Sequence, residues 1–424
     1  MWSLRCNSAI RTTAERNTEA VSAARLRNQV VVAYAFLAVM VATALPTPLY
    51  PIYEKQLGLS SLDVTAIYGV YAVVVLATLA MFGRVSDHLG RRPVLLMAVA
   101  AAALGEVVLL TEPQTAGLYV GRAVIGFAAG LMIGSTTVYL VDLGADNNAG
   151  RAHIFAVVAN LGGQAVGAVL AGVAAQFLPH PLALPYGVGL ILLGPVALLW
   201  VLRVPETVLR NDDLRGAFTP GLGALPPQVR STFRATAATF VAAFALLGFL
   251  TALTGSILVQ QLHRPGSLTV GLVTFALFAA AAIGQLAVSA ATPTRVRAGA
   301  LALLPAAALL LGAATLARSF LLLLSAVLIC GLGVGVNLRL GMGRVLDACP
   351  PVKRAQVSSA LFVTVYLGAS LPTVAAGLMA TEANLTTAVL ALTGVVLALT
   401  LAAAVMNRLS TRAHVLVPAG RSGE

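Results

Sequence analysis

Two ionisable side chains, Glu106 and Arg122, stand inside long apolar segments of this sequence. Charged groups are costly in such surroundings and are therefore candidates for a function. The predicted helices place the two groups at similar depth across a short link, where an ion pair would ease the burial of both. A buried carboxyl group can also carry a proton. The alternatives are a purely structural ion pair, or a Glu106 side chain that reaches the polar edge of its segment.

Four uncharged polar residues inside apolar segments are candidates for contact with a solute: Tyr34, Asn160, Gln164 and Asn337. Asn160 and Gln164 are four residues apart and share one face of a helix. Their amides can bind a solute, and a hydrogen bond between helices is an equal alternative. Arg339 lies nearer the end of its segment, where its side chain can reach the polar region. Few aromatic residues cluster, which argues against a sugar site built on stacked rings. The mostly apolar lining suits a hydrophobic or amphipathic solute.

The stretch GRVSDHLGRRP concentrates charge between two apolar segments. Gly83 allows the preceding helix to pack closely, and Gly90 permits a tight turn before the next helix. Asp87 is an anion that can cap a helix N-terminus or pair with an arginine. Arg91 and Arg92 offer bidentate donors to carboxylates. The alternative, that the arginines only mark the cation-rich side of a membrane, explains neither Asp87 nor the spacing of the glycines.

Composition places the chain in a membrane. Of its 424 residues, 59% are hydrophobic and 10% are charged, whereas soluble domains are about 45–50% apolar and about 25% charged. The net charge of +12 therefore concerns orientation in the bilayer and does not indicate nucleic-acid binding. The sequence shows no Ser/His/Asp set, metal-ligand cluster or phosphate-binding loop. We therefore expect no enzyme activity, ATP-driven pumping, metal or cofactor.

Twelve apolar segments are long enough to cross a bilayer, which takes about 20 helical residues. Backbone polar groups in lipid must be satisfied within the chain, so we expect twelve helices. They lie near 28–50, 62–83, 93–110, 116–141, 152–177, 183–203, 234–258, 267–290, 297–316, 320–343, 354–379 and 385–406. If both termini are cytoplasmic, 23 of the 27 Lys and Arg residues fall on the cytoplasmic side, and Lys55, Arg264 and Arg318 on the other. This bias predicts that orientation.

The two halves of the chain repeat each other. The longest polar gap, 204–232, has the proline, glycine and charge content of a linker and divides the helices six and six. An offset of 205 residues aligns Gly126 with Gly331 and Gly163 with Gly368. Paired bundles of this kind are typical of transporters whose binding site lies at the membrane midplane.

We therefore predict an all-α membrane protein of two six-helix bundles related by an internal repeat. The predicted organisation is a mostly disordered cytoplasmic tail 1–27, a bundle 28–203, a cytoplasmic linker 204–232, a bundle 233–406 and a cytoplasmic tail 407–424.

GRVSDHLGRRP resembles the signature loop between helices 2 and 3 of the major facilitator superfamily, and every defining position matches. Arg122, Gly126 and Gly130 resemble the helix-4 motif Arg-x-x-x-Gly-x-x-x-Gly of that family. The sequence VPET after the sixth helix also recurs there. The resemblance implies the fold of that family, with twelve helices in two halves, and transport by alternating access.

The fifth predicted helix partly resembles the antiporter motif of the family. Gly163, Gly167 and Gly172 allow close helix packing. Ala168 and Ala171 depart from the motif, because they replace its proline and the first of its final pair of glycines.

The resemblance also implies a charge latch. In the family, the acid matching Asp87 reaches the start of helix 11, and the matching arginine pairs with an acid at the end of helix 4, here Asp142. Such a latch holds the cytoplasmic gate shut when the site faces outward. The arginine matching Arg122 often participates in proton coupling.

We therefore expect a secondary active transporter in the plasma (cell inner) membrane that exports a small hydrophobic or amphipathic solute in a proton-coupled reaction. The alternatives are proton-coupled import of a small metabolite and a membrane receptor that does not transport. The expected partners are the solute, protons and the lipid bilayer, with no nucleic acid, and the expected state is a monomer.

Overall fold

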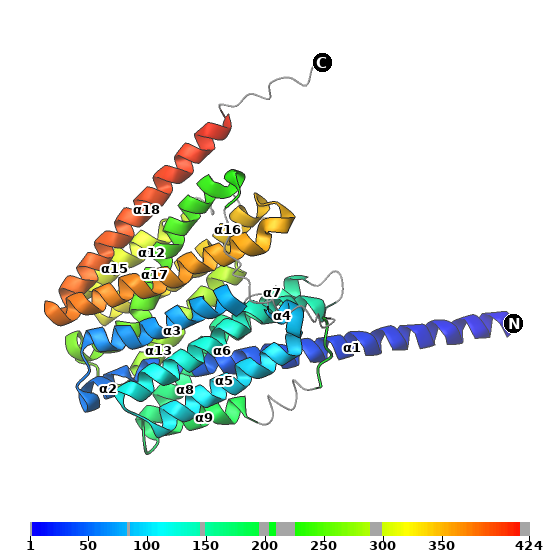
Figure 1. Cartoon of the computed structure of the whole chain (residues 1–424), viewed down its shortest axis with the longest axis horizontal. Helices are drawn as coiled ribbons and strands as arrows, with labels where there is room; N and C mark the ends of the chain where they lie inside the picture. The colour runs from blue at the N-terminus through cyan, green and yellow to red at the C-terminus, as the bar shows by residue number, and fades with distance from the viewer. Residues whose placement is uncertain are drawn as a thin grey trace.

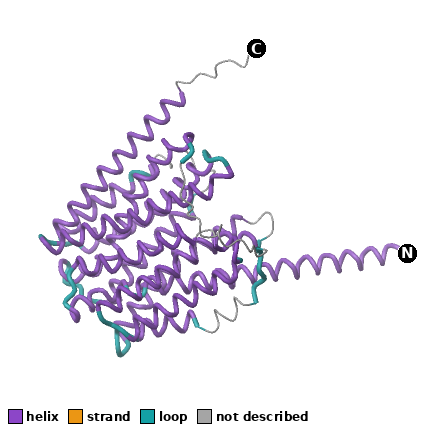
Figure 2. The backbone as a smooth tube through the Cα atoms, in the orientation of Figure 1, coloured by secondary structure: helices purple, strands orange, loops and turns teal. Residues whose placement is uncertain are grey.

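The computed structural model describes residues 2–82, 85–144, 149–194, 203–208, 225–288 and 299–415. Within these ranges the chain is helical and contains no strand (Figure 2). Gly83 of the predicted latch lies outside the described residues.

Helices of the first half form one bundle, and helices of the second half form another (Figure 1). The first half contains α1 (Trp2–Ala44), α2 (Tyr50–Leu57), α3 (Ser61–Phe82), α4 (Val85–Leu89), α5 (Arg91–Thr111), α6 (Thr115–Asp142), α7 (Ala149–Val157), α8 (Gly163–Phe177) and α9 (Leu184–Leu193). The second half contains α12 (Arg230–Ser256), α13 (Ser267–Leu286), α15 (Leu303–Ala317), α16 (Phe320–Asp347), α17 (Arg354–Glu382) and α18 (Leu385–Val415). A π-helical turn, Val158–Gly162, joins α7 to α8, and a second, Ile257–Gln261, follows α12.

Ten of the twelve predicted membrane spans are confirmed in the described residues. In the described part of the chain, ten helical segments are long and apolar enough to cross a bilayer, and α9 and α15 are shorter apolar helices. Large apolar side chains face outward from the bundles, as Ile191, Leu321 and Leu401 do at 77%, 73% and 66% exposure. Exposure of such an apolar surface to water is unfavourable, whereas its contact with lipid is favourable. The chain is therefore a multi-pass membrane protein with the all-helical fold predicted from its sequence.

The prediction of a mostly disordered N-terminal tail is wrong for the described residues. Helix α1 begins at Trp2, so residues 2–27 continue the helix of the first span beyond the other helices (Figure 1). Alanine, glutamate and arginine are frequent in this segment and favour helix. Helix α18 likewise runs to Val415, past the predicted end of the last span at 406.

The first span is broken near its far end by prolines. Helix α1 stops at Ala44, a single 3₁₀ turn covers Thr47–Leu49, and α2 follows at once. Pro46 and Pro48 have no backbone N–H to donate and so interrupt the helical ladder here. We call the end of the molecule that carries α2 the opposite face. The end that carries residues 85–92, Asp142 and residues 203–208 is the motif face.

All five predicted packing glycines lie against a neighbouring backbone. Gly126 and Gly130 face α3, Gly163 and Gly167 face α1, and Gly172 faces α13. A methyl group at Gly126 would stand 2.7 Å from the carbonyl oxygen of Tyr71, which is closer than real side-chain carbons approach. Absence of a side chain therefore sets the distance between these helices.

The repeat in the sequence reappears as a repeat of contacts. Gly331 of α16 faces α13 as Gly126 of α6 faces α3, and Gly368 of α17 faces α12 as Gly163 faces α1. The equivalent glycines Gly172 and Gly377 both contact the other bundle, Gly172 at α13 and Gly377 at α3. The two halves are thus built alike and meet through equivalent surfaces.

We expect Gly163→Ala to destabilise the fold. The added methyl group would stand 2.7 Å from both the carbonyl oxygen of Leu37 and the Cβ of Met40, and overpacking of this kind costs about 1–3 kcal/mol. Gly394→Ala in α18 is the matched control, because nothing lies within 4 Å of its added methyl group. The unfolding temperature of the detergent-solubilised protein should fall for the first variant and stay unchanged or rise for the second. Equal temperatures would show that this approach does not limit stability.

Candidate functional site

A cavity of about 440 Å³ lies between the two bundles. We call it the central cavity. Its lining comes from α1, α3, α6, α7 and α8 on one side and from α12, α13, α16 and α17 on the other. The lining reaches from Thr47, next to α2, to Leu346, one residue before the end of α16 at the motif face. The central cavity therefore extends through much of the molecule towards the motif face.

Aromatic side chains are numerous in this lining. They are Phe36, Tyr68, Tyr71, Phe244, Phe278, Phe362 and Tyr366. The expectation that few aromatics cluster is therefore wrong. These residues are far apart in the sequence and come from α1, α3, α12, α13 and α17, so only the packing of the helices brings them to one space.

Arg122 lines the central cavity with a charge that is almost completely buried. Its side chain is 1% exposed, and Nη1 donates to the backbone oxygen of Thr43 at 2.7 Å. The guanidinium carbon lies 4.4 Å from the ring centre of Tyr71, a cation–π contact. Nε has no hydrogen-bond partner, and Arg122 forms no ion pair within the described part of the chain.

Glu106 does not form the ion pair with Arg122 that was considered from the sequence. It does not reach the polar edge of its span either, because it is fully buried. Neither carboxyl oxygen has a hydrogen-bond partner among the described residues. The group lies against α9, where a methyl group at Gly189 would stand 2.8 Å from Oε2. Glu106 is behind the wall of the central cavity and is not one of the residues that line it.

Asn160 and Gln164 both line the central cavity. The Nε2 atom of Gln164 donates to Oδ1 of Asn160 at 3.1 Å. The pair therefore presents one joined polar surface to the cavity instead of a bond between helices. Asn160 belongs to the π-helical turn Val158–Gly162, and turns of this kind are frequent at functional sites.

Tyr34 and Asn337 have structural partners and do not line the central cavity. The hydroxyl of Tyr34 donates to the backbone oxygen of Leu192 at 3.1 Å and ties α1 to α9. The Nδ2 atom of Asn337 donates to the backbone oxygens of Ala300 and Gly333, both at 2.8 Å. The amide of Asn337 therefore holds α16 in place.

Two basic residues of the cavity lining, His153 and Arg339, were not among the site residues predicted from the sequence. His153 precedes Asn160 by seven residues, a spacing that keeps it on the same helix face, so that spacing was an available signal. Nε2 of His153 is buried, and no described residue forms a hydrogen bond with it. The arginine was expected to reach the membrane edge. Instead it lines the cavity together with Gly335 and Met342 of the same helix.

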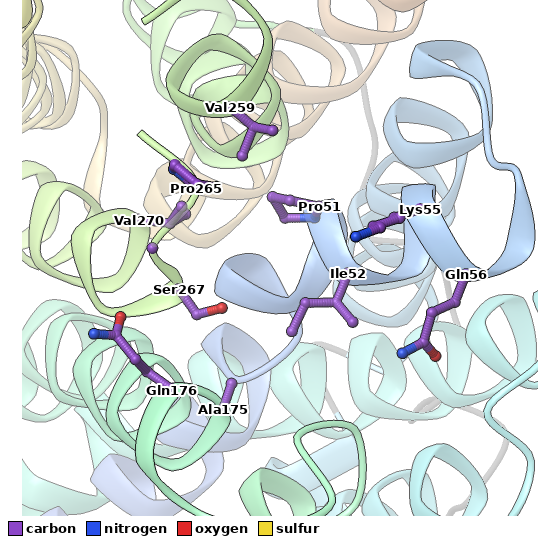
Figure 3. Close-up of a pocket in the computed structure, with 11 residues that line it drawn as sticks. Pro51, Ile52, Lys55, Gln56, Ala175, Gln176, Val259, Pro265, Ser267 and Val270 are labelled. Carbon is purple, nitrogen blue, oxygen red and sulfur yellow. The ribbon is translucent and has the colours of Figure 1, made fainter. Parts of the chain in front are cut away.

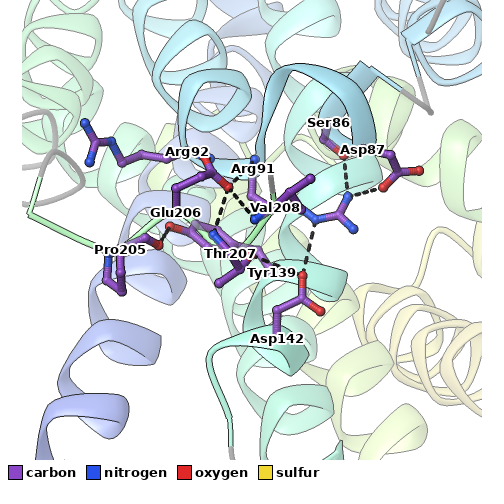
Figure 4. A network of polar contacts seen from close by, with 10 residues as sticks. All are labelled: Ser86, Asp87, Arg91, Arg92, Tyr139, Asp142, Pro205, Glu206, Thr207 and Val208. Atoms are coloured by element: carbon purple, nitrogen blue, oxygen red, sulfur yellow. Dashed lines mark hydrogen bonds and ion pairs between the residues drawn. The ribbon is translucent and has the colours of Figure 1, made fainter. Parts of the chain in front are cut away.

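The motif face carries a network centred on Arg91 (Figure 4). Its Nη1 atom contacts Oδ1 of Asp87 at 2.5 Å and donates to Oγ of Ser86 at 2.7 Å. Its Nε atom lies 3.4 Å from Oδ2 of Asp142, so the pair implied by the resemblance is present. The Asp87 side chain is 53% exposed and is held by Arg91 within its own bundle. Arg92 has a different role, because its Nη1 donates to the backbone oxygen of Val204 at 3.5 Å.

Comparison with known proteins gives the family. A sequence model of the Major Facilitator Superfamily matches residues 32–373. The chain belongs to this superfamily. The match includes the motif network, Arg122 and most of the central cavity.

Individual relatives of this superfamily member are distant. Myo-inositol transporter 2 of Schizosaccharomyces pombe is 27% identical over 150 residues, 35% of this chain and 26% of that protein. The class G tetracycline resistance protein of Vibrio anguillarum is 32% identical over 119 residues, 26% of this chain and 29% of that protein. These matches span less than a third of each relative. The crystal structure of the nucleoside transporter NupG has a TM-score of 0.69 at 16% identity, covering 90% of this chain and 99% of that one.

The network of this superfamily member also includes Glu206 of VPET, which was not predicted as a site residue from the sequence. Its carboxylate accepts from the backbone N–H groups of Arg91 (2.9 Å) and Arg92 (3.0 Å) at the start of α5. It thereby caps a helix N-terminus, where a negative charge is favoured. Gly90 has φ 98°, and a methyl group there would stand 2.6 Å from Oε2 of Glu206. A glycine at this position is thus required by the turn and by the cap.

Hydrogen bonds join the two bundles at the opposite face. They run from Ser256 Oγ to Glu54 Oε1 (2.8 Å), from the Leu62 N–H to Thr381 Oγ1 (3.0 Å) and from the Leu268 N–H to Gln176 Oε1 (3.0 Å).

A second cavity of about 740 Å³ lies at the opposite face between α2, α8 and α13, lined by residues such as Ile52, Lys55 and Pro265 (Figure 3). It has fewer polar groups than the central cavity and none from α6, α16 or α17.

We expect Glu206→Ala to loosen the start of α5. Loss of a helix cap costs about 0.5–2 kcal/mol, and the N–H groups of Arg91 and Arg92 would lose their acceptor. Hydrogen exchange of peptides that cover the first turn of α5 should become faster. Glu382→Ala, at the exposed end of α17, is the control and should leave that exchange unchanged. Unchanged exchange in Glu206→Ala would mean that the cap does not stabilise this helix.

Proposed function

We propose that this protein is a secondary active transporter that exports a small amphipathic solute by alternating access, in exchange for protons. The central cavity supports this proposal most strongly. Both bundles line it, it extends to the motif face, and hydrogen bonds between the bundles lie at the opposite face. Movement of one bundle against the other would transfer such a cavity from one side of a membrane to the other.

The proposed orientation puts the motif face, both termini and the linker 204–232 in the cytoplasm of a plasma-membrane monomer. The distribution of arginine supports it, because 23 of the 27 cations fall on that side in this arrangement. In this orientation the central cavity of the described structure faces the cytoplasm, and the opposite face is external.

Asp87, Arg91 and Asp142 would form the latch of the motif face. The three side chains are already in contact through Arg91, and Asp87 is still half exposed. An exposed carboxylate on a rigid turn is available to reach the second bundle when the motif face closes. In that state the Asp87 carboxylate would leave the solvent and contact the start of α17, where a helix N-terminus favours a negative charge.

Glu106 is the proposed proton carrier. Because its carboxyl group is buried without a hydrogen-bond donor, the neutral acid is the form that suits the site in this state. The charged or titratable groups that face it are Arg122 of α6, Tyr53 of α2 and Tyr186 of α9. A shift of Arg122 towards Glu106 in another state would favour release of the proton.

The direction of transport rests on the likeness to the tetracycline resistance protein. Import of a metabolite is the second candidate, and the likeness to the myo-inositol transporter favours it. Both directions use the same cavity, so an imposed gradient distinguishes them.

The coupling is tested in vesicles that contain the purified protein and a trapped pH dye. The probes are naphthyl, phenyl and octyl carboxylates with their matched amides and amines. We expect at least one probe to be driven by a pH gradient, outward from the side of the motif face. Flux that ignores the gradient for every transported probe would exclude proton coupling.

In the same vesicles, Glu106→Gln should abolish accumulation driven by a pH gradient and preserve exchange of the solute, because glutamine has a similar shape and no titratable proton. Glu382→Gln is the control and should keep both activities. Accumulation retained by Glu106→Gln would remove this residue from the coupling mechanism.

Asp87→Asn should lower the transport rate severalfold without lowering the amount of folded protein, since an amide lacks the charge that the latch requires. Asp347→Asn makes the same change at an exposed position of the same face and should transport normally. A normal rate in Asp87→Asn would exclude the latch.

A further inference from the structure

The central cavity has an unbalanced charge. Its basic lining residues are Arg122, Arg339 and His153, and no Asp or Glu is among the described residues that line it. Arg339 is exposed, but Arg122 is buried. Burial of an uncompensated cation is costly, and a bound anion would offset that cost. Water could solvate such a cation if it were exposed, but the side chain of Arg122 is only 1% exposed.

Arg122 has donor capacity that the protein does not use. A guanidinium has five N–H donors. Nη1 donates to the backbone oxygen of Thr43, and Nε is buried without a partner among the described residues. A carbonyl and the face of the Tyr71 ring supply only partial negative charge. A carboxylate is the ligand group that matches both the planar donors and the missing charge.

The two arginines lie at different depths. Arg122 is seven residues from the start of α6, about 10 Å from the opposite face, and Arg339 is eight residues from the end of α16, about 12 Å from the motif face. Cations at two depths along an apolar wall concentrate anions and guide them inward. Arg339 is therefore placed to attract an anion from the motif face, and Arg122 to hold it.

The remaining wall suits an apolar body. Rings such as those of Tyr68, Phe362 and Tyr366 line the same space, and its volume of about 440 Å³ is within the range for small-molecule sites, about 300–1,000 Å³. We propose that the solute is an amphipathic organic anion, with its carboxylate on Arg122 and its ring or chain against the aromatic wall. This inference rests on the proposed function, because it takes the central cavity as the transport site.

Binding to the purified protein in detergent tests the charge requirement. The probes are naphthyl, phenyl and octyl carboxylates, each compared with the amide and the amine of the same skeleton. A charge-assisted contact predicts that at least one carboxylate binds about tenfold more tightly than its amide, and that amines bind more weakly than either. The proposal fails if no carboxylate binds, or if amides or amines bind as tightly as their carboxylates.

Variants identify the residues. Arg122→Gln should remove the preference for the carboxylate, and Arg122→Lys, which retains the charge, should restore part of it. Arg339→Gln leaves the deep site intact and should weaken the salt dependence of carboxylate binding and slow its association. Arg234→Gln removes an exposed cation of α12 outside the cavity and should change nothing. A full carboxylate preference in Arg122→Gln, in protein that unfolds at the normal temperature, would overturn the assignment.

The vesicle experiment separates this inference from the proposed function. If a neutral or cationic probe is transported and no carboxylate binds, the proposed transport function stands and the proposed anionic solute is excluded. If a carboxylate binds tightly but is never transported, the anion site stands and transport through this cavity is excluded.

Discussion

Close approach of helix backbones at glycine is the constraint on which the rest of the structure depends. Helices in lipid gain little from hydrophobic burial, so association relies on dense packing. Here α6 meets α3 at Gly126 and Gly130, and α8 meets α1 at Gly163 and Gly167. With the backbones this near, the helices of each half hold one another at fixed positions. The central cavity is the space left where the two bundles are not packed in this way.

Glycine also determines where the bundles touch. Gly172 brings α8 against α13, and its repeat equivalent Gly377 brings α17 against α3. Side-chain hydrogen bonds such as that between Ser256 and Glu54 add to these contacts at the opposite face. Most of the contact between the bundles runs along the helix pairs α3–α17 and α8–α13. Smooth backbone surfaces without large side chains allow one bundle to turn against the other.

Charge is distributed in two contrasting ways. At the motif face, Arg91 is shared between Asp87 and Asp142, and Glu206 caps α5, so the charges there are paired and partly exposed. Inside the molecule, Arg122 and Glu106 are buried without an ion pair in the described structure. Paired charges at a surface stabilise one arrangement of the chain. A charge that is unpaired in an apolar interior favours whatever neutralises it. For Glu106 that is a proton, and for Arg122 it is a bound anion.

The sequence by itself determined the all-helical membrane class, the repeat and the position of the glycines, because hydropathy and residue size are local properties read directly from the chain. It also indicated the Arg91–Asp142 pair through a family motif. Only the tertiary structure decided which polar groups meet. Asn337 and Tyr34, predicted for the cavity, are bound to backbone oxygens, whereas His153, Arg339 and the aromatic wall were assembled from helices distant in sequence. The face that a residue presents depends on the rotation of its helix against its neighbours, and that rotation is fixed by contacts between segments that no local pattern contains.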